Sequence, residues 1–305
     1  KKPITGFSQH TRAFLKVQDG CDNFCSYCKV ALVRGKPRSK KLAEVLAEAK
    51  SLVDRGYKEI VLTGICLGAY GKDLKGKTTL LNLLDSLEKL QNLCRIRLSS
   101  IEPQDIDKDL VEYLSQSPKA CRHLHIPLQS GDDRILKAMN RRYSSRDFEK
   151  LIGGLTKKIP GFCLTTDCMI GFPGEEEVNF LNTVNLIKKA SPLKVHIFPY
   201  SARPLTKAAE FTDLVNPLDV RRRCLDLTQV ALGCRHKVMR SFQGSIVQVL
   251  IERQTKDDPA YLEGFSDNYL PVKTPFKNNL VNCMVAVKLK KTFKDGLIGE
   301  YVDKV

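Results

Sequence analysis

The chain has 305 residues, of which 42% are hydrophobic and 28% are charged. This composition is typical of a folded globular protein and excludes a mainly disordered chain, because there is ample apolar material for a core. No stretch reaches the roughly 18 apolar residues that a membrane helix needs. With 50 basic and 34 acidic residues the net charge is +16, which indicates a polyanionic partner such as nucleic acid.

The first two thirds of the chain predict alternating strands and helices. Short apolar runs predict strands at residues 13–17, 59–63, 95–99, 123–127, 164–170 and 194–199. Apolar residues at helical spacing predict helices at residues 42–53, 80–90, 109–115, 148–157, 175–189 and 218–240. Six such units predict an α/β domain with parallel strands, either an open sheet or an incomplete barrel, whose functional loops follow the strands.

The pattern changes after about residue 242. Five short strands without helices are predicted at residues 245–251, 261–265, 269–272, 280–288 and 297–302, separated by Gly, Asn, Asp and Pro. Such a series is typical of a small antiparallel barrel. We therefore predict a second domain over residues 238–305.

The chain has eleven cysteines, an odd number that argues against a disulfide framework. Cys21, Cys25 and Cys28 stand at a CxxxCxxC spacing directly after the first predicted strand. Three thiolates within eight residues can hold one face of an iron–sulfur cluster. A structural zinc site needs four ligands, and no fourth Cys or His stands nearby at a matching spacing. The spacing favours a cubane cluster with one iron left for another ligand; a zinc site with a remote cysteine and chance spacing are the alternatives.

This spacing, in a chain of six strand–helix units, resembles the radical S-adenosylmethionine (radical SAM) superfamily. Further runs resemble its methylthiotransferase family: residues 11–21, 34–39 (RGKPRS), 61–64 (VLTG), 68–71 (GAYG), 99–103 (SSIEP), 123–131 (HLHIPLQSG) and 171–175 (GFPGE). The runs at residues 99–103 and 123–131 look most like those of the members that act on threonylcarbamoyladenosine in tRNA. Residues 264–269 and 295–299 are similar to the TRAM domain with which these enzymes hold RNA.

The resemblance implies an incomplete (β/α)6 radical SAM barrel over residues 11–237 and an all-β TRAM barrel over residues 238–305. It implies that Cys21, Cys25 and Cys28 bind a 4Fe–4S cluster whose fourth iron takes S-adenosylmethionine. The radical formed from that cofactor would remove hydrogen from carbon 2 of threonylcarbamoyladenosine at position 37 of tRNA, and a methylthio group would replace it.

Other substrates and another class of protein stay open. Isopentenyladenosine in tRNA and a ribosomal protein are the alternative substrates within the family. A non-catalytic tRNA-binding protein with a structural metal site is the alternative outside it.

Family members also carry an N-terminal domain whose three further cysteines bind a second 4Fe–4S cluster. This chain starts after the point where that domain would end, so we interpret residues 1–10 as a linker from the missing domain. We expect the chain alone to cleave S-adenosylmethionine without completing sulfur insertion. The chain departs from the family pattern in two places: Ala31 and Leu32 stand where a proline usually follows the third cysteine, and Leu205 stands where a glycine is common before Thr206. The second change affects the expected substrate pocket.

Several other residues are candidates for cofactor contacts. Tyr27 is expected to stack on the adenine of S-adenosylmethionine, with a packing role as the alternative. Strand-ending residues are further candidates to contact this cofactor: Thr63, Gly64, Ser100, Gln129 and Gly171. His123 and His125 share a strand face and, with Cys121, could bind a metal; cleft-lining or core histidines are the alternatives.

Basic residues predict where RNA binds. Arg34, Lys36 and Arg38 stand beside the cysteine loop, and Lys288, Lys290 and Lys291 stand in the predicted barrel. Each run alone could be a solvated surface, but together they suggest a track for phosphates. We expect a cytoplasmic monomer whose partners are a tRNA anticodon stem-loop and an electron donor such as flavodoxin or ferredoxin, with no membrane.

Overall fold

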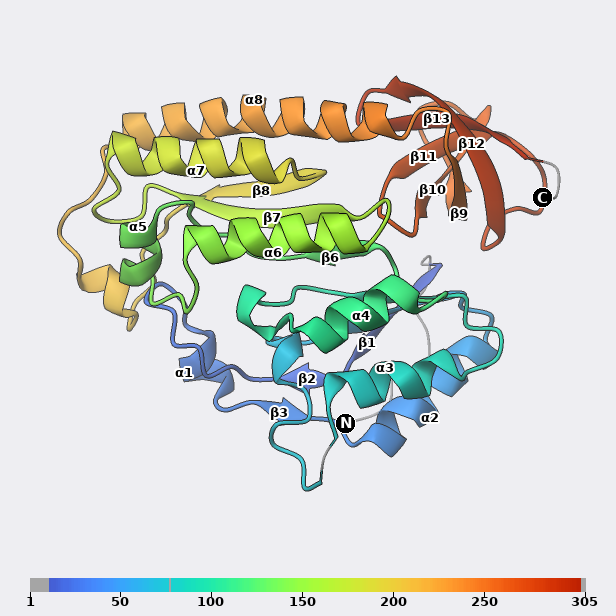
Figure 1. The fold of residues 1–305 in the computed structure, drawn as a ribbon, viewed down its shortest axis with the longest axis horizontal. Helices are drawn as coiled ribbons and strands as arrows, with labels where there is room; N and C mark the ends of the chain where they lie inside the picture. The colour runs from blue at the N-terminus through green and yellow to red at the C-terminus, as the bar shows by residue number, and fades with distance from the viewer. Residues whose placement is uncertain (1–10, 77, 303–305) are drawn as a thin grey trace.

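The computed structural model describes residues 11–76 and 78–302 (Figure 1); the linker predicted over residues 1–10 lies outside the described residues. Six parallel strands form the larger part of the molecule: β1 (Arg12–Lys16), β4 (Glu59–Thr63), β5 (Arg95–Leu98), β6 (His123–His125), β7 (Cys163–Ile170) and β8 (Lys194–Pro199). They form two sheets, β1-β4-β5 and β6-β7-β8, joined by parallel bridges between Ile96 and Ala120 and between Ser100 and His125. Because β1 and β8 are edge strands, the barrel is incomplete, as predicted.

Helices pack along the outside of these strands (Figure 1). They are α2 (Leu42–Asp54), α3 (Leu80–Glu88), α4 (Lys108–Gln116), α6 (Ser145–Lys158), α7 (Glu177–Ala190) and α8 (Pro217–Ser241). Thr79 and Ser144 form capping boxes that fix the starts of α3 and α6. Their apolar faces share one core with the outward side of the strands, and Leu62, Leu87 and Phe148 are among its fully buried members.

The C-terminal part is a closed five-stranded barrel, as predicted. Its strands are β9 (Ile246–Gln254), β10 (Tyr261–Ser266), β11 (Pro271–Pro275), β12 (Met284–Phe293) and β13 (Gly296–Tyr301), in the order β10-β11-β13-β12-β9. The prediction that the barrel is antiparallel throughout is wrong, because β11 and β13 pair in parallel. An odd number of strands cannot alternate in direction all the way around a closed ring.

A buried ionic cluster joins the two parts at the amino ends of β4 and β5. Glu59 is fully buried; its carboxylate accepts from Arg97 Nε at 2.6 Å and lies 3.5 Å from Arg95 Nη1. The same guanidinium groups donate to the backbone carbonyls of Phe265 and Asp267 in the β-barrel, each at 3.0 Å. The β-barrel is therefore fixed to the end of the strands opposite to the loops that follow β1, β4 and β5.

The shortest elements were not predicted from the sequence. These are β2 (Gln18–Asp19), β3 (Arg38–Ser39), α1 (Val30–Arg34), α5 (Asp133–Ala138) and the 3-10 turns η1 (Leu67–Ala69), η2 (Pro103–Asp105) and η3 (Lys207–Glu210). The predicted start of α7 is also two residues early, because Glu175 turns inward and accepts a hydrogen bond from the Gly171 N–H. Within the described parts of the chain, every helix is too short or too polar to span a bilayer.

Candidate active site

The three cysteines of the CxxxCxxC run lie in a loop whose ends are tied together. The loop leaves β2 and returns through β3, and these two short strands pair in an antiparallel manner. The Cys21 N–H donates to the Gly35 carbonyl at 3.0 Å. Gly20 has φ +78°, and a Cβ at this position would lie 2.2 Å from the Lys36 carbonyl oxygen. Only glycine therefore lets the two ends of the loop approach this closely.

The segment after α5 holds the loop from the other half of the barrel. The Ser26 N–H donates to the Met139 carbonyl at 3.0 Å, and the Ser26 hydroxyl donates to the Ala138 carbonyl at 2.8 Å. The Asn140 amide donates to the Phe24 carbonyl at 2.9 Å. The cysteines are thus positioned by residues more than 100 positions away in the sequence.

Each cysteine sulfur accepts a hydrogen bond from the protein. The donors are the Asn23 N–H to Cys21 at 3.5 Å, Arg141 Nη1 to Cys25 at 3.3 Å and the Val30 N–H to Cys28 at 3.4 Å. Hydrogen bonds to sulfur stabilise the thiolate form, which is the form that binds iron. Cys21, Cys25 and Cys28 therefore fit the role of three thiolate ligands of an iron–sulfur cluster.

The electrostatics around these sulfurs depend on a buried arginine. Burial raises the pKa of Cys25, and the charge of Arg141 opposes that shift. Arg141 also pairs with Glu102, a carboxyl group whose pKa is raised by burial. A hydrogen bond with the Cys66 thiol lowers the pKa of Cys21 to about 7. The surroundings therefore favour the thiolate at Cys21, whereas at Cys25 the charge of Arg141 only partly offsets burial.

The three cysteine sulfurs are not gathered into one compact set. Among residues 11–76 and 78–302, the one set of at least three His, Cys, Asp or Glu side chains whose ligand atoms all lie within 4.8 Å of one another is His125, Asp167 and His196. A 4Fe–4S cluster binds each thiolate through a different iron, so its ligands need not lie that close together.

Of the predicted cofactor-binding residues, Gln129 points to a ligand and Tyr27 is engaged in packing. Tyr27 packs with Phe198 and Tyr200 against a buried apolar cluster, which is the alternative role expected for it, and burial raises its pKa. Gln129 is buried with φ +64°, and its side-chain oxygen has no hydrogen-bond partner among the described residues. A buried amide in this state is normally paired, so a ligand atom could satisfy it.

The other predicted residues lie at the carboxyl ends of neighbouring strands. Thr63 and Gly64 end β4, Ser100 follows β5, and Gly171 follows β7. All four are therefore on the side of the barrel from which the cysteine loop emerges. The Gly171 N–H is already donated to Glu175 at 3.1 Å, so this turn also has a structural role.

The predicted RNA-binding residues fall into two separate groups. Arg34 and Arg38 lie 3.8 and 3.9 Å from the Asp19 carboxylate, and Lys36 is exposed between them. The other three are exposed on β12: Lys288, Lys290 and Lys291. Figure 1 shows α1 at one end of the molecule and the β-barrel at the other, so a phosphate track between the groups would follow the whole length of the protein.

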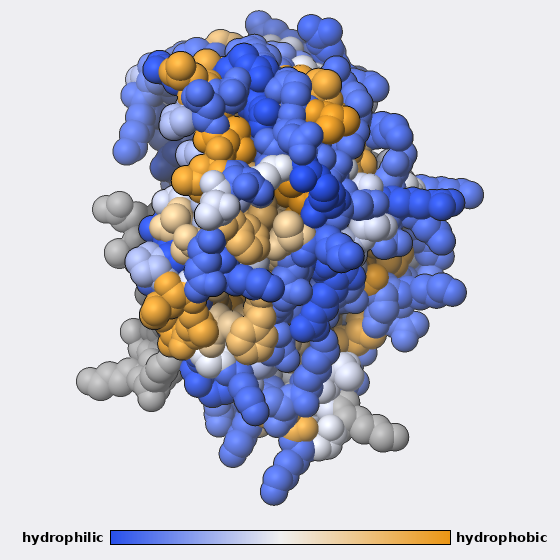
Figure 2. Space-filling view, turned by 90° about the vertical axis from the view of Figure 1, so that its left-hand side faces the viewer, coloured by the Kyte–Doolittle hydropathy of each residue, from blue (hydrophilic) through white to orange (hydrophobic). Residues whose placement is uncertain are grey.

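The end of the molecule that carries α1 also exposes apolar side chains. Figure 2 shows this end face-on, with apolar patches between hydrophilic ones. Exposed apolar residues in the cysteine loop, in α1 and around η3 are Phe24, Leu32, Val33, Leu205 and Leu214. The surface around the cysteine loop is therefore mixed rather than uniformly basic.

Two residues of this site are not among those predicted from the sequence. The Arg141 side chain is 4% exposed and pairs with Glu102. The Cys66 thiol contacts Cys21. No local signal distinguishes these residues, because the fold alone brings them to the loop.

Comparison with known proteins defines the class first. The model of the radical SAM superfamily matches residues 15–187. A radical S-adenosylmethionine methyltransferase from Kitasatospora setae, TsrM, has the same fold over 65% of this chain and 38% of its own, with a TM-score of 0.54 at 18% identity. Both findings agree with the incomplete barrel and with the cysteine loop after its first strand.

Curated relatives define the family. The chain is 37% identical to the threonylcarbamoyladenosine tRNA methylthiotransferase MtaB of Bacillus subtilis over 98% of this chain and 67% of that protein. It is also 37% identical to the tRNA-2-methylthio-N(6)-dimethylallyladenosine synthase of Clostridium tetani, over 96% of this chain and 64% of that protein. The chain belongs to the radical SAM superfamily and, within it, to the tRNA methylthiotransferase family. It spans about two thirds of the length of these curated relatives.

Proposed function

We propose that this chain is the radical SAM and RNA-binding part of a methylthiotransferase that modifies carbon 2 of threonylcarbamoyladenosine at position 37 of tRNA. The observation that carries the proposal is the cysteine loop, in which Cys21, Cys25 and Cys28 each accept a hydrogen bond at sulfur. When bound there, a 4Fe–4S cluster with S-adenosylmethionine supplies the one-electron chemistry that removes an unactivated hydrogen.

The residues of the chain would then bind and orient the cofactor and exclude water from the site. Arg141 holds Cys25 through its guanidinium group, and the hairpin of β2 and β3 keeps the loop closed. The side-chain oxygen of Gln129 would accept a hydrogen bond from the cofactor, and the ring of Tyr27 would cover the cofactor. Thr63, Gly64, Ser100 and Gly171 would line the same pocket at the strand ends.

The choice of nucleoside rests on the relatives and on the sequence runs at residues 99–103 and 123–131. Relatives from Bacillus subtilis and Thermotoga maritima are named for threonylcarbamoyladenosine, and those from clostridia are named for dimethylallyladenosine. A ribosomal protein is a third candidate substrate.

The remaining parts of the proposal concern domains and partners. Residues 11–237 would form the radical SAM domain and residues 238–305 the TRAM domain, with α8 crossing the boundary. A second 4Fe–4S cluster would belong to a further domain. The partners would be a tRNA anticodon stem-loop and an electron donor such as flavodoxin or ferredoxin, and the protein would act as a cytoplasmic monomer.

Anaerobic reconstitution tests the chemistry. The chain is loaded with iron and sulfide and given S-adenosylmethionine and dithionite, and 5′-deoxyadenosine is measured. We expect a brown protein with about four irons that forms this product. Cys25→Ala should lose iron and product together, whereas Cys94→Ala should retain both, because Cys94 lies outside the loop. A colourless zinc protein without product would instead support a non-catalytic RNA-binding module.

A second experiment tests the nucleoside. Transfer RNA from a strain that lacks the gene is digested and analysed by mass spectrometry. Loss of the methylthio group from threonylcarbamoyladenosine alone is expected. Loss from isopentenyladenosine alone would contradict the proposed substrate but not the radical chemistry.

A further inference from the structure

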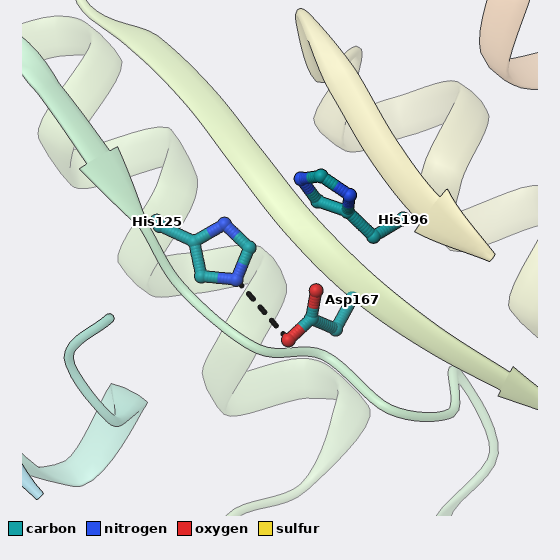
Figure 3. Close-up of side chains that lie close together, drawn as sticks. All are labelled: His125, Asp167 and His196. Atoms are coloured by element: carbon teal, nitrogen blue, oxygen red, sulfur yellow. Dashed lines mark ion pairs between the residues drawn. The ribbon is translucent and has the colours of Figure 1, made fainter. Parts of the chain in front are cut away.

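A second group of metal-type side chains lies on three neighbouring strands, apart from the cysteines. His125 is on β6, Asp167 on β7 and His196 on β8, and Asp167 and His196 are direct partners in the sheet. Figure 3 shows the three side chains pointing toward one another. His125 Nε2 lies 3.1 Å from an Asp167 carboxylate oxygen, and one ligand atom from each residue lies within 4.8 Å of the others.

The group faces the interior of the barrel. Side chains alternate between the two faces of a strand, and the neighbours Leu164 and Ile197 pack into the core beneath the helices. The three side chains therefore point to the opposite, inner face. Two residues further along the same face, Met169 and Phe198 belong to the apolar cluster that also contacts Tyr27. The three side chains therefore lie deeper in the barrel than the apolar cluster that contacts Tyr27, by two residues along β7 and β8.

Both ring nitrogens of His125 have partners in the structure. His125 Nδ1 lies 2.9 Å from the Thr165 hydroxyl, which also lies 2.9 Å from His123 Nε2, and Nε2 pairs with the Asp167 carboxylate. The tautomer with its proton on Nδ1 would donate to Thr165 and turn the Nε2 lone pair toward a metal ion, which would take the place of the ion pair between Nε2 and Asp167. Metal-binding histidines are usually held in this way by a partner on the second nitrogen.

We propose that His125, Asp167 and His196 bind a divalent first-row transition metal ion inside the barrel. Two imidazoles and one carboxylate form a common three-ligand set that leaves coordination positions open. Nitrogen and oxygen donors suit zinc or iron(II), whereas the sulfur donors of the cysteine loop suit a cluster. The open positions would face the barrel interior. This inference goes beyond the proposed function and holds for any nucleoside substrate.

Zinc binding to the cluster-loaded chain tests the proposal. The reconstituted protein is freed of loosely bound metal and dialysed against buffered Zn²⁺, and zinc and iron per chain are measured. We expect one zinc per chain in addition to the cluster iron. His196→Ala and Asp167→Asn should each weaken zinc binding by at least about tenfold, with iron content unchanged.

The matched control is His236→Ala, which removes an exposed histidine on α8 and should leave zinc binding unchanged. Equal zinc uptake by wild type and His196→Ala, or no uptake by either, would overturn the site. Weaker tRNA binding by His196→Ala without any zinc binding would also overturn it and would identify the group as a substrate contact. Since zinc is measured without S-adenosylmethionine or tRNA, the result is independent of the proposed reaction.

Discussion

Arg141 is the residue on which the cysteine loop depends most. It joins Cys25 to Glu102, and both members of the ion pair are largely buried. We predict that Arg141→Gln lowers the free energy of unfolding by about 3–5 kcal/mol, because it leaves a buried carboxylate without its partner. Urea denaturation measures this.

The double variant Arg141→Gln/Glu102→Gln provides the control. It removes both charges, so it should recover part of the stability that the single variant loses. Equal losses in the two variants would argue against the ion pair as the cause.

Leu205 is strained at the position where the family pattern has glycine. Its φ is +69° and its side chain is 83% exposed, so burial of the side chain does not offset the free energy cost of the left-handed backbone. The left-handed conformation costs a residue with a Cβ about 1–2 kcal/mol, and glycine costs about 0.4–1 kcal/mol through the unfolded chain. We predict that Leu205→Gly raises the free energy of unfolding by up to about 1 kcal/mol.

Leu214→Gly is the matched comparison, because Leu214 is exposed but does not have a positive φ. It should lower stability by about 0.5–1 kcal/mol. If both variants shift the thermal midpoint in the same direction, strain at Leu205 does not explain the difference.

The strand β6 carries a buried titratable group against the second barrel. His123 stacks on Tyr269 with ring centroids 4.6 Å apart, and its Nδ1 has no hydrogen-bond partner among the described residues. Burial lowers the pKa of His123 well below 6.5. The folded protein therefore keeps this ring neutral when the unfolded chain takes up a proton.

This difference makes stability depend on pH. The contribution of His123 is fully present above pH 6.5 and is lost as pH falls below it, by up to about 1.4 kcal/mol per pH unit. Between pH 7.5 and 5.5 the wild type should lose about 1.4 kcal/mol more than His123→Gln in urea denaturation. Parallel losses in the two proteins would show that another group carries the pH dependence.

The same elements show what local sequence can and cannot predict. Strands such as β4 were predictable because they are continuous apolar runs, and helices such as α2 because one face is apolar. By contrast, β2 and β3 have two residues each and exist only because they pair with each other. The parallel pairing of β11 with β13 follows from closing the ring, which no local pattern reports.

Some residues of the two candidate sites could likewise be predicted from local sequence, and others could not. The spacing of Cys21, Cys25 and Cys28 was readable because ligands of one cluster stand close together in the sequence. Asp167 and His196 were not identified as partners of His125, because each stands in a different strand. Their proximity requires the register of β6, β7 and β8, which is a property of the fold.

At the scale of the whole molecule, the cysteine loop and the β-barrel lie at opposite ends of the parallel strands (Figure 1). The buried group of Glu59, Arg95 and Arg97 fixes the β-barrel in place, and Arg122 adds a half-buried pair with Asp267. A ligand that touches both the β12 lysines and the cysteine loop must therefore be long and follow one side of the protein.

The β12 lysines give the last prediction. Lys290 lies in a bulge opposite β13 and Lys291 follows it, and both are exposed. If both lysines contact phosphates, Lys290→Ala/Lys291→Ala should weaken tRNA binding. It should also reduce the slope of log K against log salt by about 1.5–2, because binding then neutralises fewer phosphates and releases fewer counterions. Lys150→Ala/Lys157→Ala on α6 removes the same charge outside the β-barrel and should leave the slope nearly unchanged. Equal slopes for wild type and the β12 variant would place the RNA elsewhere, since a change in net charge alone is common to both double variants.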